Sequence, residues 1–190
     1  DHPQSFTDVS AWWPYYKLHG DHLGRVSYML SRGVAANRVA VLEPTTSGFM
    51  WARRGASTPE LATMKSNYGE LIQYMADHQM DFDLVDEYIL EWFGKPGAKR
   101  LAVGKASYDV LIWPKDMTNV RSQTVGLLEK YLAGGGEILA LSEPAAYVDG
   151  RASDKLSILH TRYAAQWHTV AALADLVSEV RRRAVPRIAF

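Results

Sequence analysis

The chain has 190 residues, of which 47% are hydrophobic and 22% are charged, and its 21 basic residues balance its 21 acidic ones. This length and composition suit one globular domain with a buried core, and the balanced charge argues against a nucleic-acid-binding protein. No apolar run approaches the roughly 18 residues that a membrane-spanning helix needs. The chain has no cysteine, which excludes disulfides, thiolate metal sites and cysteine nucleophiles.

The first 34 residues are predicted to form a linker followed by one helix. Residues 1–14 show no hydrophobic period, whereas apolar residues between Tyr15 and Arg32 recur at helical steps and Gly33 suits a C-terminal cap. We assign residues 1–34 to a linker and helix from a preceding module, and residues 35–190 to one α/β domain. Position 1 is Asp rather than Met, so we expect that the chain starts after a processing event or is a segment of a longer protein. The apolar run at 187–190, which looks like a strand with nothing after it, favours the segment.

The rest of the chain alternates between predicted strands and predicted helices. Short apolar runs predict strands at 38–44, 109–113, 137–142 and 187–190. Helices are predicted at 58–79, 120–132, 155–161 and 166–183, with a loop at 45–57 and a small hairpin turning at Gly104 and Lys105. This alternation predicts a mostly parallel sheet with helices on both faces.

Four carboxylates, Asp81, Asp83, Asp86 and Glu87, lie close together in the chain. Asp81 and Asp83 match the Asp-x-Asp-x-Val pattern of magnesium-dependent phosphotransfer sites, but that chemistry needs the first Asp at the tip of a buried strand. The preceding residues instead resemble the polar end of a helix, and a calcium loop would need glycine and alternating ligands. We therefore favour helix capping, with Asp83 as the cap and the next two carboxylates in the first turn, each stabilising the helix by about 0.3–1 kcal/mol.

Two further patterns resemble ligand sites. His19 and His22 are spaced to lie on one helix face, but no third metal ligand is evident, so no metal site is predicted. Residues 134–136 are three glycines that run from a helix into a strand, whereas a phosphate loop runs from a strand into a helix. We interpret these glycines as a helix stop.

Neither strand end with reactive side chains offers a complete set of catalytic groups. The sharpest turn follows Trp113 and supplies Lys115 and Asp116 at the place where a nucleophile commonly stands. The next strand end supplies Ser142 and Glu143, with no histidine evidently beside them. We predict no catalytic residue in this chain.

An aromatic group at Trp12, Trp13, Tyr15 and Tyr16 has two interpretations. Aromatic faces suit the apolar faces of sugars, so the group could stack on a carbohydrate. Such a cluster also packs against neighbouring domains, which is the commoner role.

The order of motifs resembles α-L-rhamnosidase-type glycoside hydrolases of family 106. The resemblance runs from about Trp12 to Ser153. It rests on a helix ending in Leu-x-x-Gly, a strand ending in Pro-Thr, the segments Phe-Asp-x-x-Asp-Glu and Tyr-x-x-Leu-x-x-Pro, and the glycine-rich turn at 134–136. In such enzymes this segment looks like the domain that follows the catalytic barrel. The resemblance therefore implies a three-layer, flavodoxin-like fold of the class I glutamine amidotransferase type.

The resemblance also implies a function. The catalytic carboxylates would lie on a barrel that this chain lacks, and zero cysteines exclude amidotransferase activity. The chain is then a non-catalytic accessory domain without a cofactor, whose partners are the barrel, the carbohydrate substrate and a second subunit of a homo-oligomer. His2, Gln4, Trp12 and Trp13 would lie nearest the sugar. Such hydrolases often act outside the cytoplasm, which favours a periplasmic or extracellular parent.

The alternative hypothesis is a free-standing flavodoxin-like protein. It would bind a ligand, or transfer phosphoryl groups with magnesium, through Asp81 and Asp83.

Overall fold

The computed structural model describes residues 7–32, 36–54 and 56–184, and the chain divides into two compact units, Asp1–Ala35 and Ala36–Phe190. The described part of the first unit holds a short 3-10 helix, η1 (Trp13–Tyr15), and α1 (Tyr16–Leu30), which confirms the predicted helix. No residue of α1 is buried.

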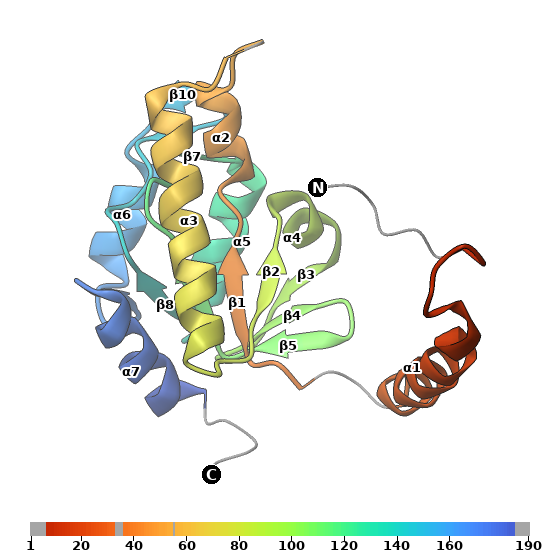
Figure 1. Ribbon diagram of the computed structural model, residues 1–190. Coiled ribbons are helices and arrows are strands. Elements are labelled where there is room, and N and C mark those ends of the chain that lie inside the picture. Colours follow the sequence, from red (N-terminus) through yellow and green to blue (C-terminus); the bar gives the residue numbers. More distant parts are fainter. Residues whose placement is uncertain (1–6, 33–35, 55, 185–190) are drawn as a thin grey trace. The chain divides into compact units, whose positions relative to one another are not determined.

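The second unit is built on a sheet of five parallel strands in the order β2-β1-β6-β8-β11. Figure 1 labels β1, β2 and β8 of this sheet. The strands are β1 (Val39–Leu42), β2 (Asp83–Val85), β6 (Val110–Trp113), β8 (Glu137–Ala140) and β11 (Trp167–Thr169). Numbered along the chain, this order is 2-1-3-4-5, the flavodoxin-like arrangement. In the register, Ala40 of β1 lies opposite Asp83 on one side and Leu111 on the other. The expected flavodoxin-like α/β fold is confirmed.

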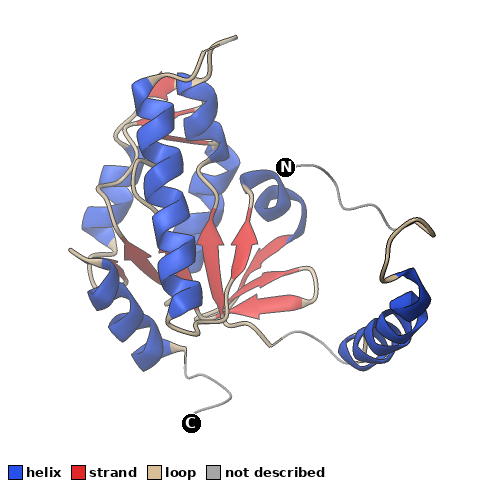
Figure 2. Ribbon diagram, in the orientation of Figure 1, coloured by secondary structure: helices blue, strands red, loops and turns tan. Residues whose placement is uncertain are grey.

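The described residues of this unit form six helices, which cover both faces of the sheet (Figure 2). They are α2 (Thr45–Trp51), α3 (Pro59–Asp77), α4 (Glu87–Phe93), α5 (Ser122–Ala133), α6 (Lys155–Arg162) and α7 (Leu173–Arg183). Alternate residues of each strand point to opposite faces, so Val41 joins a core with α3 and α7, whereas Leu42 joins a core with α4, α5 and α6. The result is three layers.

Two small sheets complete the unit. The first is antiparallel and contains β3 (Gly94–Pro96), β4 (Leu101–Val103) and β5 (Ala106–Tyr108). Gly104 turns between β4 and β5 with a φ of +59°, which confirms the predicted hairpin. The second contains β7 (Asn119–Val120), β9 (Tyr147–Val148) and β10 (Arg151–Ala152).

Several sequence-based assignments were wrong in detail. The predicted loop at 45–57 begins with α2, and the predicted helix at 166–183 is β11 followed by α7. Trp167 and Val170 are spaced like residues on one helix face, which hid the short strand. Asp83 does not cap a helix, because it begins β2. The strand expected at 187–190 lies outside the described residues.

Candidate functional site

Ligands of doubly wound α/β folds bind beyond the carboxyl ends of the strands, where the strand order reverses. In this sheet the reversal lies between β1 and β6. β1 leads through Glu43 and Pro44 into α2, and β6 leads through a turn into β7 and α5. The candidate site is therefore the carboxyl edge around these connections.

A buried carboxylate, Glu87, lies at this edge. Its side chain is 0% exposed although it is the first residue of α4. Oε1 accepts a hydrogen bond from the Thr46 hydroxyl, and Oε2 accepts hydrogen bonds of 2.7 Å from both the Arg121 backbone amide and the Thr124 hydroxyl. Burying an ionised group is costly unless donors surround it, and these three donors meet that need.

The position of Glu87 explains why a carboxylate is favoured there. Thr46 lies in the first turn of α2, Arg121 is the N-cap of α5, and Glu87 itself begins α4. Helix N-termini present amide groups and partial positive charge, and they commonly bind phosphate or other anions. Here three helix starts converge on a side-chain anion of the protein itself.

A second buried group closes the same edge. The Ser47 hydroxyl donates to the Asn119 carbonyl oxygen at 2.8 Å and accepts from the backbone amides of Thr118 and Asn119, both at 3.0 Å. The Asn119 side chain in turn accepts a 2.8 Å hydrogen bond from the Gly150 amide. These contacts join α2, β7 and the loop after β9, so the side chains of Ser47 and Asn119 are satisfied within the chain. The buried Thr118 hydroxyl at the same edge has no hydrogen-bond partner among the described residues.

Two titratable groups beside β1 have shifted pKa values. Burial, reinforced by the nearby Asp86 carboxylate, raises the pKa of Glu43 above its ordinary value. Burial and the Glu43 charge raise the pKa of Tyr68 on α3, and its buried hydroxyl has no hydrogen-bond partner among the described residues. In both groups burial disfavours the charged form.

The sharp turn expected after β6 is present. Asp116 adopts a φ of +61°, a left-handed conformation that non-glycine residues seldom take. Its carboxylate accepts a 2.7 Å hydrogen bond from the Asn67 side chain on α3, and the Ser142 hydroxyl donates to the Pro114 carbonyl oxygen at 3.0 Å. A nucleophile elbow leads directly into a helix, whereas this turn leads into β7, and its side chain is a hydrogen-bonded carboxylate.

The acidic stretch that suggested phosphotransfer is at the wrong edge of the sheet for that chemistry. Asp83 begins β2 at the amino end, where its carboxylate accepts 2.8 Å hydrogen bonds from the side chains of Asn37 and Tyr108. Asp81 precedes the strand and is exposed. Among the residues that the structure describes, no group of three or more His, Asp or Glu side chains is arranged to hold a metal ion.

Helix capping in this stretch is present, but at a different residue. The Asp86 side chain accepts a 2.7 Å hydrogen bond from the Tyr88 amide and caps α4. The cap prediction thus had the correct helix and the wrong aspartate. The shift arises because Asp83, Leu84 and Val85 pair with β1 before the helix begins.

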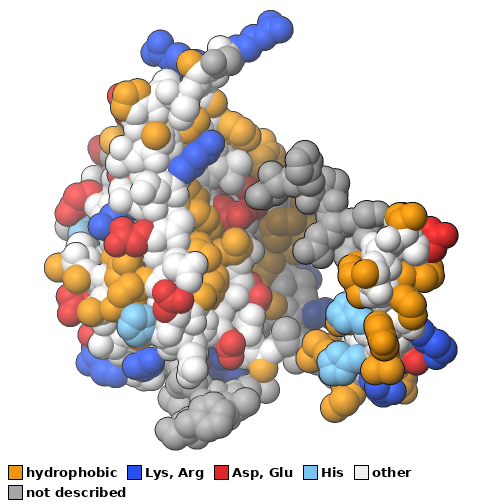
Figure 3. Space-filling view, viewed as in Figure 1, with side chains coloured by type: hydrophobic (Ala, Val, Ile, Leu, Met, Phe, Trp, Pro, Cys, Tyr) orange, Lys and Arg blue, Asp and Glu red, His pale blue; other side chains and the backbone are white. Residues whose placement is uncertain are grey.

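The sequence-predicted sugar contacts lie in the first unit. Trp12 and Trp13 are 40% and 39% exposed, and the Trp13 ring stacks on Tyr16 with centroids 5.3 Å apart. His2 and Gln4 lie outside the described residues. Figure 3 shows hydrophobic and histidine side chains on the surface of α1, which is consistent with its lack of buried residues.

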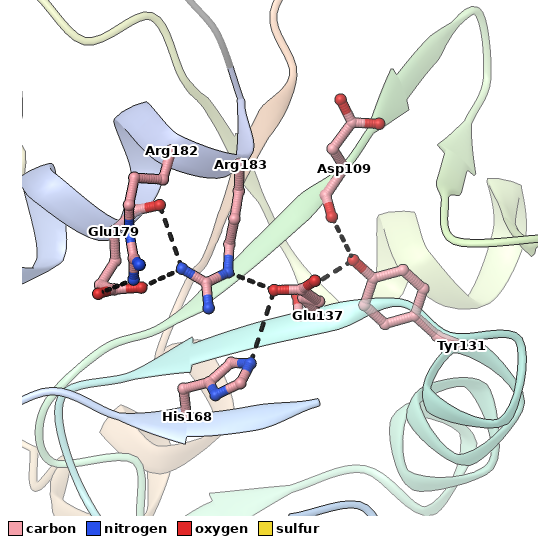
Figure 4. Close-up of polar contacts among 7 residues, drawn as sticks. All are labelled: Asp109, Tyr131, Glu137, His168, Glu179, Arg182 and Arg183. Carbon is pink, nitrogen blue, oxygen red and sulfur yellow. Dashed lines mark hydrogen bonds and ion pairs between the residues drawn. The ribbon is translucent and has the colours of Figure 1, made fainter. Parts of the chain in front are cut away.

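A charged network at the amino edge secures α7 (Figure 4). Arg183 forms ion pairs with Glu137, which begins β8, and with Glu179 on its own helix. Hydrogen bonds from Arg182 and Arg183 lower the pKa of Glu179 from 4.5 to about 2. His168 Nε2 lies 3.5 Å from Glu137. Each carboxylate in the network has an arginine partner, as expected of a structural contact.

A hollow of about 510 Å³ beside the starts of α5 and α6 contains Arg151 and Lys155. Its helix start is already occupied, because Asp149 accepts a 3.0 Å hydrogen bond from the Ser122 amide. Hydrogen bonds from Ser122 lower the pKa of Asp149, which keeps this carboxylate charged. A side-chain anion fills this position, as Glu87 does at the carboxyl edge.

Comparison of the chain with protein-family models, with curated proteins and with solved structures gave no significant match. Within the described residues, no helix is both long enough and apolar enough to cross a membrane.

Proposed function

We propose that this chain is a non-catalytic α/β domain of a large glycoside hydrolase of the α-L-rhamnosidase type. It supports a catalytic barrel in the same protein and contributes to the substrate cleft or to contacts between subunits. The parent uses paired carboxylates on the barrel to cleave a terminal rhamnose-like sugar, and acts in the periplasm or outside the cell.

The buried position of Glu87 is the main support for a non-catalytic role. A cofactor-binding or catalytic domain of this fold keeps the carboxyl edge open for its ligand. In this chain Glu87 fills the position where the three helix starts would attract an anion, and three donors hold it there. The sheet thus has the strand order of a ligand-binding domain, but a side chain of the chain itself occupies the position of the ligand.

The turn after β6 supports the same role. Amidotransferases of this fold require a cysteine nucleophile, and the chain has none. The sharp turn instead holds Asp116, whose carboxylate is bound by Asn67. The Asp116 side chain thus binds the turn to α3, as expected of a support domain.

Helix α1 supports a place beside another protein surface. Leu18, Met29 and Leu30 are each more than 70% exposed. A helix with so many exposed apolar side chains is usually covered by a partner. A domain that packs against a barrel provides such a partner, and Trp12 and Trp13 would then lie beside the substrate.

The intact mass of the native gene product tests the proposal. A mass several-fold above the 21.3 kDa of this chain, together with release of L-rhamnose from an aryl rhamnoside, is the expected result. Within that parent, Asp116→Asn should leave the rate of hydrolysis nearly unchanged, whereas Trp12→Ala should raise KM. A native mass near 21.3 kDa, or loss of activity in a well-folded Asp116→Asn variant, would overturn the proposal.

A further inference from the structure

The turn between β9 and β10 consists of Asp149 and Gly150, which have φ angles of +51° and +74°. Two-residue hairpin turns of type I′ need a positive φ at both positions, and Asp-Gly is one of the sequences that adopt them readily. These two residues are the single Asp-Gly pair of the chain. Because glycine has no side chain, the backbone nitrogen that follows the aspartate is open to attack on the aspartate's own carboxyl group.

That attack is the first step of a spontaneous isomerisation. The Gly150 nitrogen forms a bond to the side-chain carboxyl carbon of Asp149, and the amide proton leaves with the carboxyl hydroxyl group as water. A cyclic imide remains, and water then adds to one of its two carbonyl groups and opens the ring. Opening on one side restores aspartate, whereas opening on the other side routes the backbone through the side chain as isoaspartate. The mass is unchanged, because one water leaves and one is added.

In the folded chain both reacting groups are bound by other residues. The Gly150 amide donates a 2.8 Å hydrogen bond to Asn119 Oδ1, and the Asp149 carboxylate accepts a 3.0 Å hydrogen bond from the Ser122 amide. The Asp149 amide donates to the Val120 carbonyl oxygen at 2.9 Å. Ring closure therefore requires that the nitrogen leaves Asn119 and that the carboxyl group leaves Ser122.

The charge of Asp149 opposes the reaction as well. Ring closure needs a protonated carboxyl group, because the hydroxyl group departs as water and an ionised carboxylate has no such leaving group. Hydrogen bonds from Ser122, reinforced by the charges of Arg121 and Lys155, lower the pKa of Asp149. The carboxyl group therefore stays ionised to lower pH in the folded chain than in a free peptide.

The segment that holds the turn is itself fixed, whereas the turn is open to solvent. Asn119 is 5% exposed, and its carbonyl oxygen accepts a 2.8 Å hydrogen bond from the Ser47 hydroxyl. Asp149 and Gly150 are both exposed, so water, the co-reactant of the second step, reaches them. Hydrogen bonds rather than burial therefore keep the two reacting groups apart.

We propose that Asp149 is a site of spontaneous isomerisation to isoaspartate, which the folded chain suppresses through Asn119 and Ser122. Local opening of the β9–β10 turn releases both reacting groups and starts the reaction. Isoaspartate places an additional carbon in the backbone of the turn and displaces the carboxylate that binds the start of α5. The modification therefore accumulates in molecules whose turn has opened, and it weakens the contact that had suppressed it.

Tryptic mapping of the intact chain, after prolonged incubation at mildly acidic pH below its unfolding temperature, tests the proposal. The tryptic peptide 131–151 contains Asp149 as its single aspartate, so a chromatographic shift without a change in mass reports isomerisation at this residue. We expect the folded chain to isomerise at least about tenfold more slowly than the same peptide free in solution, because the turn must first break several hydrogen bonds. Equal rates in the two would overturn the proposal.

Substitutions of Ser122 separate the contribution of its amide. Ser122→Pro removes the amide that binds Asp149, and proline is favoured at the first position of a helix, which Ser122 occupies in α5. This change should raise the isomerisation rate of the folded chain several-fold, and Ser122→Ala, which keeps the amide, should raise it less. Gly126→Ala, on the same helix with open space around it, is the control and should leave the rate unchanged. A folded Ser122→Pro variant that isomerises no faster than the parent chain would also overturn the proposal.

Discussion

Oε2 of Glu87 accepts a 2.7 Å hydrogen bond from the backbone amide of Arg121, so one buried carboxylate joins the start of α4 to the start of α5. The same carboxylate reaches α2 through Thr46. Neutralising it should loosen three helix starts together, although the change lies at a single side chain.

Glu87→Gln should lower the free energy of unfolding by about 1–3 kcal/mol, because the neutral amide offers one acceptor oxygen in place of the two carboxylate oxygens that the three donors use. Glu87→Ala should cost more, since the Arg121 amide and the Thr124 hydroxyl both lose their acceptor. Urea unfolding followed by circular dichroism measures both. Glu60→Gln, an exposed change in the first turn of α3, should stay within about 0.5 kcal/mol. Equal stability of Glu87→Gln and Glu60→Gln would show that Glu87 is not structural.

The aspartates of the acidic stretch should differ in stability effect according to their contacts. Asp86→Ala removes the cap of α4 and should cost about 0.5–2 kcal/mol. Asp83→Ala should cost about as much, because it removes the acceptor for Asn37 and Tyr108. The exposed Asp81→Ala should change stability by less than about 0.5 kcal/mol. Thermal unfolding of the three variants gives the ranking, and a larger loss at Asp81 than at Asp86 would contradict it.

Glu43 should make stability fall as pH rises. Its pKa is raised in the folded state, so folding favours the protonated form below the ordinary value of 4.5 and loses that advantage as pH climbs through the folded value. Glu43→Gln should therefore be more stable than the parent at neutral pH. The two should converge below pH 4.5. Urea midpoints across this range test the sign, and a less stable Glu43→Gln at neutral pH would refute it.

Glu179 should have the opposite effect on the pH dependence of stability, which should fall as pH is lowered. Its pKa is lowered to about 2 by Arg182 and Arg183, so its stabilising effect is complete above 4.5 and disappears as pH falls toward 2. Glu179→Gln should be less stable than the parent at neutral pH, with a difference that closes in acid. A constant difference across that range would show that the effect is one of packing alone.

The glycines after α5 should not tolerate alanine. A Cβ at Gly136 would overlap the Tyr131 ring, whose hydroxyl binds the Asp109 and Glu137 carbonyl oxygens at 3.0 and 3.1 Å. Gly136→Ala should cost about 1–3 kcal/mol, as overpacking of a core does. Gly126→Ala is the control, because Gly126 is exposed within α5 with open space around it, and this change should stabilise the helix by up to about 1 kcal/mol. A thermal midpoint unchanged by Gly136→Ala would be inconsistent with this packing.

The central strands could be predicted because β1 and β6 are buried on both faces and are continuous apolar runs. The outer strands could not. β2 reads Asp83-Leu84-Val85 and β11 reads Trp167-His168-Thr169, each of three residues with polar positions, so neither run stands out from its surroundings. They become strands because the neighbouring strand already presents unpaired amide and carbonyl groups.

The role of Glu87 was predicted only in part. Its place at the start of α4 follows from the preference of helix N-termini for carboxylates, but its burial does not. Thr46 and Thr124 lie far from it in the chain, and only the assembled sheet brings the three together. The available signal was weak: both threonines sit in the first turn of a helix.

The strand order has a consequence for how the chain acquires its structure. β1 is the second strand from one edge, and its neighbour β6 begins only at Val110, opposite Val39. During synthesis the apolar segment of β1 therefore emerges long before the strand that shields its side, and β8 and β11 come later still. Pairing between strands far apart in the sequence slows folding and prolongs the exposure of apolar segments to solvent. Truncation before β8 should yield an aggregation-prone polypeptide, so this unit has to be expressed whole.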